Sequence, residues 1–178
     1  MKKLVWISLL LLTACSGVKT SFDYDKNSDF SKFKTYGYAE DVAKLPIPEL
    51  DRGRVIAAID KQMTAKGFTK STSPDVWIDL QVKLEQKTEA TATNTGGGMY
   101  GRPYRYGYAG GFSTTYVNVE NYVVGTLFIN MIEKTSEKMV WQGRGTKTLS
   151  EDVSPEKKEQ NINYAVEQIF KKYPPVRK

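Results

Sequence analysis

The sequence predicts an α+β fold in which two helices pack on a mostly antiparallel sheet. Three long segments have the pattern of strands, and the clearest of them, Val76–Leu84, alternates apolar and polar residues as a half-buried strand does. Two other segments repeat apolar residues at intervals of three or four, which is typical of amphipathic helices. Because strands that follow one another closely tend to pair as hairpins, the expected order is β-β-α-β-β-β-α.

Two short strands are expected before the first helix. Apolar residues or threonine occupy every second position from Val18 to Tyr24, which predicts a half-buried strand. Turn-forming residues follow at 27–29, and Thr35–Ala39 is expected to form the second strand. Prolines at the end of the next loop hold it extended before the helix begins.

The first helix is expected to start near Pro48–Leu50, since proline suits a first turn and acidic residues suit the positive end of the dipole. An apolar stripe recurs every four residues, at Val55, Ile59 and Met63. We expect the helix to end at Lys66, with Gly67 as a left-handed cap and Phe68 returning to the core.

Three strands are expected in the second half of the chain. Val76–Leu84 shows the clearest alternation, and a polar extension continues it through Thr93. Ser113–Glu133 carries apolar residues on both faces, which indicates a central strand or one covered on both sides. Met139–Thr148 would return as the third strand. Trp77 lies on the polar side of its strand, and either packs against a neighbouring loop or helix or contacts a partner.

The last helix carries its own start and stop signals. Ser154 is a suitable N-cap, and Pro155 suits the first helical position. The apolar stripe consists of Ile162, Ala165, Val166, Ile169 and Tyr173. Pro174 and Pro175 then end the helix.

Residues 94–112 differ from the rest of the chain in being rich in glycine, tyrosine and arginine. They lack the strand-to-helix context and the spacing of a phosphate-binding loop. One interpretation is a mobile connection between two long strands. The other is a partner-binding loop that stacks on sugars, peptidoglycan or another protein. Its candidate binding residues are Tyr100, Arg102, Tyr104, Arg105, Tyr106 and Tyr108.

The first residues have the pattern of a secretory signal. Two lysines precede the apolar run Leu4–Leu12, and small residues precede Cys15. The run is far shorter than the roughly 20 residues that a membrane-spanning helix needs. Leu12–Cys15 resembles the lipobox of bacterial lipoproteins. The resemblance implies a signal peptide at 1–14, cleaved before Cys15.

The same resemblance implies that Cys15 is acylated and holds the mature chain on a membrane. Two or three acyl chains anchor a protein far more firmly than one. The expected organisation is a lipidated tether at 15–21 and a single domain at 22–175. Ser16 is not the aspartate that favours retention at the inner membrane, so we expect the outer membrane, with the domain facing the periplasm.

Composition excludes several functional classes. The chain has no histidine, and Cys15 is its one cysteine. Histidine-based catalytic pairs and transition-metal sites are therefore not expected, and neither is an internal disulfide. The net charge of +6 is spread along the chain rather than concentrated, which argues against nucleic-acid binding. We expect no metal, no cofactor and no enzymatic activity.

Two further segments carry a family resemblance. The sequence from Asp29 to Tyr36 and the closing helix from Asn161 to Pro175 resemble those of the DUF4136 lipoproteins, a bacterial family without a known function. The resemblance covers most of the mature chain, about Ser21 to Pro175. It implies a shared fold and provides no catalytic residues.

These observations favour a non-enzymatic envelope lipoprotein that binds an envelope protein or peptidoglycan, or has a structural role. One alternative is an accessory domain that carries a lipid or other ligand between sheet and helices. The other is a carboxylate-dependent glycan hydrolase, which needs two carboxyls about 5–10 Å apart. Asp79 and Glu85 would lie about 20 Å apart on one strand, whereas Asp23 and Asp25 would lie at roughly 7 Å.

Overall fold

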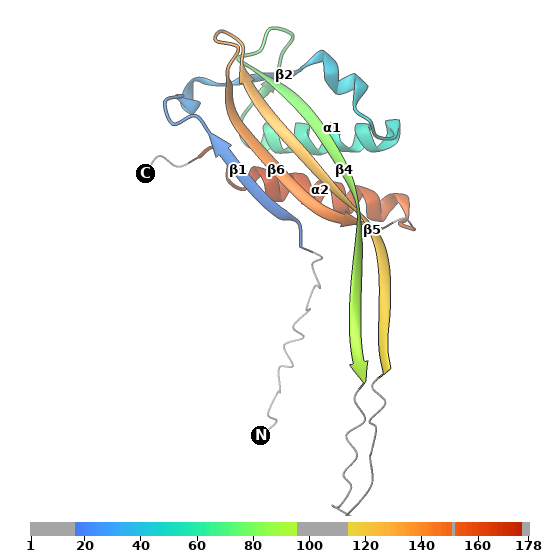
Figure 1. The fold of residues 1–178 in the computed structure, drawn as a ribbon. Helices are drawn as coiled ribbons and strands as arrows, with labels where there is room; N and C mark the ends of the chain where they lie inside the picture. The colour runs from blue at the N-terminus through green and yellow to red at the C-terminus, as the bar shows by residue number, and fades with distance from the viewer. Residues whose placement is uncertain (1–16, 96–113, 151, 176–178) are drawn as a thin grey trace, which may run out of the picture.

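The computed structural model describes residues 17–95, 114–150 and 152–175 (Figure 1). They form one six-stranded sheet in the order β1-β6-β5-β4-β2-β3, and two helices cover one of its faces. The strands are β1 (Lys19–Tyr24), β2 (Thr35–Tyr38), β3 (Thr69–Lys70), β4 (Val76–Thr95), β5 (Thr114–Glu133) and β6 (Met139–Leu149). The helices are α1 (Glu49–Ala65) and α2 (Pro155–Phe170), and two 3₁₀ turns, η1 (Phe30–Lys32) and η2 (Glu40–Lys44), flank β2.

The predicted α+β class and element order are confirmed. β1, β6, β5 and β4 pair antiparallel, whereas β2 pairs parallel with both β3 and β4, so the sheet is mixed. β3 is an addition to the expected order, because a two-residue strand is too short to show any alternation. β1 starts at Lys19, so residues 19–21 of the expected tether are already paired with β6.

Both helices begin with the predicted chemistry, and α1 also ends as predicted. α2 ends at Phe170, four residues before Pro174, so Tyr173 of the expected stripe lies beyond the helix. α1 starts directly after Pro48, and Gly67 adopts the left-handed conformation at φ 83° just past its end. The buried Phe68 then donates its backbone N–H to Met63 O at 3.0 Å. At α2, the Ser154 hydroxyl accepts from the backbone N–H of Lys157 at 3.3 Å, as an N-cap should.

The core lies between the helices and the side chains that β4, β5 and β6 direct toward them. Aromatic rings fill the end of this layer, where Trp141 lies 5.5 Å from Phe170 and 5.2 Å from Tyr173 between ring centroids. α2 comes close to β6 because Gly143 and Gly145 have no side chains, and Ile169 occupies the space above them. β5 is central in the sheet, and the helices cover only one of its faces (Figure 1).

Trp77 packs within the fold, as the simpler of the two interpretations proposed. Its indole lies over Gly37 of β2, where an added Cβ would come within 2.8 Å of the ring and 3.1 Å of Pro74. The position of Trp77 on the polar side of β4 is therefore explained by a contact with the neighbouring strand and loop.

We predict that Gly143→Ala destabilises the fold by about 1–3 kcal/mol, the usual cost of overpacking a core. The new Cβ would lie 2.5 Å from Ile169 Cγ2 and closer still to the indole of Trp141. The matched control is Gly53→Ala in α1, where nothing lies within 4 Å and alanine should stabilise the helix by about 0.5–1 kcal/mol. Urea unfolding of both variants measures the difference, and equal stabilities would contradict the packing described here.

Candidate functional site

The face of the sheet opposite the helices carries a row of polar side chains, one from each of four neighbouring strands. Register places Asp23 of β1 beside Gln142 of β6, Gln142 beside Asn130 of β5, and Asn130 beside Asp79 of β4. We call these four residues the polar row. Their side chains point away from the core, because the residues before and after them on β4 and β5 are buried under the helices.

Hydrogen bonds join three members of the polar row. Asn130 Nδ2 donates to Asp79 Oδ2 at 2.9 Å, and Asn130 Oδ1 accepts from Gln142 Nε2 at 2.8 Å. Asn130 is completely buried although it lies on the uncovered face. Its amide therefore holds a carboxylate and a second amide in fixed positions, while these two neighbours stay partly exposed.

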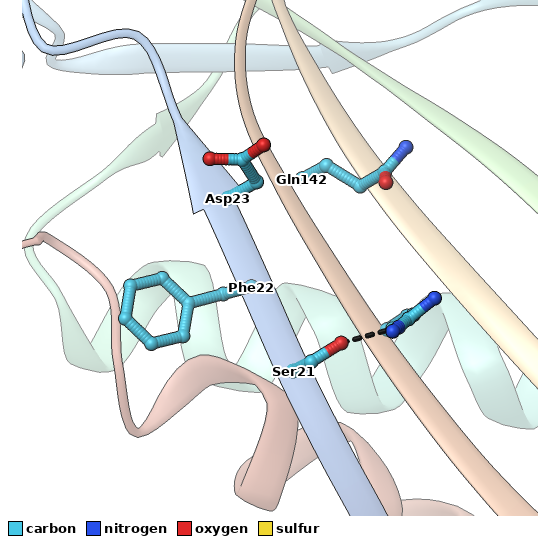
Figure 2. Close-up of a pocket in the computed structure, with 5 residues that line it drawn as sticks. Ser21, Phe22, Asp23 and Gln142 are labelled. Atoms are coloured by element: carbon cyan, nitrogen blue, oxygen red, sulfur yellow. Dashed lines mark hydrogen bonds between the residues drawn. The ribbon is translucent and has the colours of Figure 1, made fainter.

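A shallow recess of about 300 Å³ lies at the β1 end of the polar row (Figure 2). Its lining residues are Ser21, Phe22, Asp23, Gln142 and Arg144. The Arg144 Nε donates to the Ser21 hydroxyl across the β1–β6 pair, which leaves the other guanidinium N–H groups for a ligand or water. A second recess of about 260 Å³ adjoins it and shares Asp23 and Gln142.

This arrangement provides a carboxylate, an amide, a hydroxyl and a guanidinium in one open place. Such groups donate and accept hydrogen bonds to polar ligands, and the recess has no apolar lining beyond Phe22 that would suit lipid cargo. The geometry therefore suits surface recognition of a polar molecule better than enclosure of an apolar one.

The two acids of the polar row do not have the spacing of a glycoside hydrolase pair. Asp23 and Asp79 lie three strands apart, or about 14 Å at the usual strand spacing, whereas the two carboxyls of a hydrolase lie about 5–10 Å apart. The Asp25 carboxylate is used in a turn, where it accepts from Asn27 N at 2.9 Å and Ser28 Oγ at 3.0 Å. These bonds, chiefly the one from Asn27, lower the pKa of Asp25.

A second polar cluster joins α1 to β2 and β3. The hydroxyls of Tyr36 and Tyr38 donate to Asp60 Oδ1 at 2.8 and 2.7 Å, and Lys70 Nζ lies 3.0 Å from Asp60 Oδ2. Burial and the bond to the Asp60 carboxylate raise the pKa of both tyrosines, so neither is poised to act as a base or nucleophile. The cluster attaches the helix to the edge of the sheet.

Asp23 and Asp79, named from the sequence as candidate carboxylates, both lie in the polar row. Cys15 and the candidate loop residues Tyr100, Arg102, Tyr104, Arg105, Tyr106 and Tyr108 lie outside the described residues. Within the described ranges, no group of three or more cysteine, aspartate or glutamate side chains could hold a metal ion. The helices in the same ranges include none that is long and apolar enough to cross a membrane.

We predict that Asn130→Asp lowers stability near pH 7 by about 1–3 kcal/mol, because a buried carboxylate at position 130 would face the carboxylate of Asp79. In the variant, repulsion and burial raise the folded-state pKa of the carboxyl pair. The loss of stability is therefore largest above that pKa, and it disappears as the pH falls toward about 4, where both carboxyls are protonated in the folded chain. Urea unfolding at both pH values measures it. The control Asn121→Asp, at an exposed position, should show neither effect.

The chain was compared with known proteins. No curated protein matches it. Among solved structures, a PDZ domain protein from Parabacteroides distasonis is similar with a TM-score of 0.54 and 16% identity, over 89% of this chain and 36% of that one. The chain thus spans about a third of that protein's length, and the similarity shows the fold alone.

Two crystal structures of the PelC dodecamer from Paraburkholderia phytofirmans are more distant. Their TM-scores are 0.43 and 0.41, with 9% and 8% identity, over 86% of this chain and 95% of each PelC chain. The family model described as "Domain of unknown function (DUF4136)" matches residues 20–175. This range includes both helices and all six strands except Lys19, the first residue of β1. This match agrees with the resemblance in the sequence, and the chain belongs to the DUF4136 family.

Proposed function

We propose that this chain is a lipid-anchored, non-enzymatic module of a bacterial cell envelope. Acyl chains on Cys15 would hold it on the outer membrane, and its open sheet face would bind a polar partner in the periplasm. The observation that carries the proposal is the sequence of residues 1–15, a charged start and a short apolar run followed by small residues and a single cysteine.

The start of the domain supports this anchoring. β1 begins at Lys19, only four residues after Cys15, so an acylated chain would be held directly beside the lipid. Four residues span at most about 14 Å when fully extended.

The open sheet face supports a binding role. The polar row and the recess at its β1 end offer exposed or partly exposed hydrogen-bonding groups from β1, β6 and β4, and the buried Asn130 of β5 holds two of them in place. An envelope protein or peptidoglycan has the polar groups that such a face recognises, and the spacing of Asp23 and Asp79 argues against a hydrolase.

Full-length protein produced in a Gram-negative host tests the anchor. We expect mass spectrometry to find a mature chain that begins at Cys15 with acyl chains attached, and detergent phase separation to recover it with the membrane lipids. Cys15→Ser should be unacylated and remain in the aqueous phase, whereas the control Ser16→Ala should behave as the wild type. An unmodified wild-type chain would contradict the proposal.

The non-enzymatic part of the proposal has a separate test. The chain without residues 1–15 should leave purified peptidoglycan intact, as measured by release of soluble fragments. Co-sedimentation with the same sacculi then shows whether this polymer or a protein is the partner, and Arg144→Ala should weaken a glycan contact made through the recess. Turnover of the glycan would contradict a pure binding role.

A further inference from the structure

The β4–β5 hairpin extends well beyond the rest of the sheet. β6 ends at Leu149, opposite Val123, and past this point β4 and β5 pair only with each other among the described residues. The nine pairs from Lys87–Tyr122 to Thr95–Thr114 form a two-stranded ribbon that projects from the body of the domain (Figure 1). We call residues 87–95 and 114–122 the distal ribbon.

One face of the distal ribbon carries an exposed apolar patch. Ala90 pairs with Val119 and Ala92 with Val117, and the two valines are 55% and 61% exposed. Leu84 and Leu149 lie on the same face nearer the core and are 53% and 45% exposed, but Gln86 and the hydrogen-bonded pair Thr88–Asn121 separate them from the valines. These six apolar residues, the apolar stripe, lie on the face that the helices cover farther along the sheet. An exposed apolar patch bordered by polar residues, like the one at Ala90, Ala92, Val117 and Val119, marks a contact site.

The opposite face of the distal ribbon is polar, with tyrosine at its margin. It includes Lys87, Glu89, Thr91, Asn118 and Glu120, together with Tyr116 and Tyr122. One lysine against two glutamates provides no positive charge for attraction to anionic groups. A partner of the ribbon is therefore selected by apolar contact through the stripe rather than by charge.

The ribbon points toward the end of the sheet where the tether enters. β1 and β5 are both antiparallel to β6, so they run in the same direction, and Lys19 lies in the same row as Thr146 and Thr126. From Thr126, β5 extends twelve residues back to Thr114, or about 40 Å. Figure 1 shows the start of β1 and the ribbon at the same end of the molecule.

These lengths place the ribbon at the lipid surface. A bilayer that holds Cys15 lies within about 14 Å of Lys19. At the end of the sheet where Lys19 lies, the ribbon extends about 40 Å farther than Lys19 does. A domain attached this closely presents its distal ribbon to the bilayer. The tether also keeps the ribbon at high effective concentration there, so that a small apolar face is enough for contact.

We propose that the distal ribbon is a second contact with the lipid surface that holds Cys15, a proposal that rests on the proposed anchoring. Among the described residues, neither outer edge of the ribbon pairs with another strand, and an open edge of this kind does not enter the hydrocarbon interior. The ribbon instead lies in the boundary between headgroups and acyl chains, with the apolar stripe toward the lipid.

A single-cysteine probe tests this contact, because acylation uses the thiol of Cys15. Val119→Cys in the full-length lipidated protein then supplies one free thiol for an environment-sensitive fluorophore. After reconstitution into vesicles of phosphatidylethanolamine and phosphatidylglycerol, we expect a blue shift of the label and quenching by lipids that carry a nitroxide. Labels at Asn118→Cys, on the opposite face, and at Leu50→Cys, which is 74% exposed on α1, serve as controls.

The blue shift should be larger for the label on the Val119→Cys variant than for the label on Asn118→Cys, and the label on α1 should be unchanged. If the emission of the label at position 119 stays as in water, although mass spectrometry shows that the protein is acylated, the ribbon contact is overturned and the anchor is left intact. Loss of acylation overturns both proposals. A shift that appears without vesicles and grows with protein concentration also overturns the ribbon contact, since a second copy would then cover the stripe. Circular dichroism confirms that each variant is folded.

Discussion

The structure depends on the unbroken antiparallel pairing of β4 with β5. Twenty residues of each strand pair in one register, from Val76 opposite Glu133 to Thr95 opposite Thr114. Because side chains alternate between the faces, this one register sends Ile78 and Met131 into the core and brings Asp79 beside Asn130 on the open face. A slip by one residue would reverse both faces at once, so core and polar row are specified together.

The second constraint is the close approach of α2 to β6. Ile169 fills the space above Gly143 and Gly145, which lets the helix lie near the strand and bury Trp141 completely. Two helices cover one face of the sheet, and residues outside them such as Phe33, Leu45 and Tyr173 complete the core. No helix of the described chain covers the other face, where neighbours on the sheet bury residues such as Asn130 and the 7% exposed Val124.

The sequence was sufficient for the parts of the fold that local patterns encode. Alternation predicted β4, and capping residues predicted both helices, because these patterns are set by the backbone period and the helix ends. Apolar residues on both faces of β5 left its coverage undecided. Its central position explains them, since sheet neighbours shield residues such as Val124 and Phe128 without a second layer.

The polar row could not be found in the same way. Asp23, Asp79, Asn130 and Gln142 are far apart in the chain, and each looks like an ordinary outward residue of its own strand. Only the pairing register brings them together, and register depends on turns and on contacts between strands rather than on any one segment. The sequence drew attention to Asp23 and Asp79 only as carboxylates of other pairs, and a further available signal was Asn130, a polar residue within an otherwise apolar run.

The two proposals together restrict how a partner can reach the domain. With Cys15 in the lipid, Asp23 lies at most eight residues from the anchor, or about 27 Å, so the recess stays near the membrane surface. If the ribbon also rests on the lipid, the domain can no longer rotate about its tether, because two points of contact fix an axis along the membrane surface. The open face then keeps one orientation relative to the bilayer, which lowers the entropy cost of binding a partner that lies beside the same membrane.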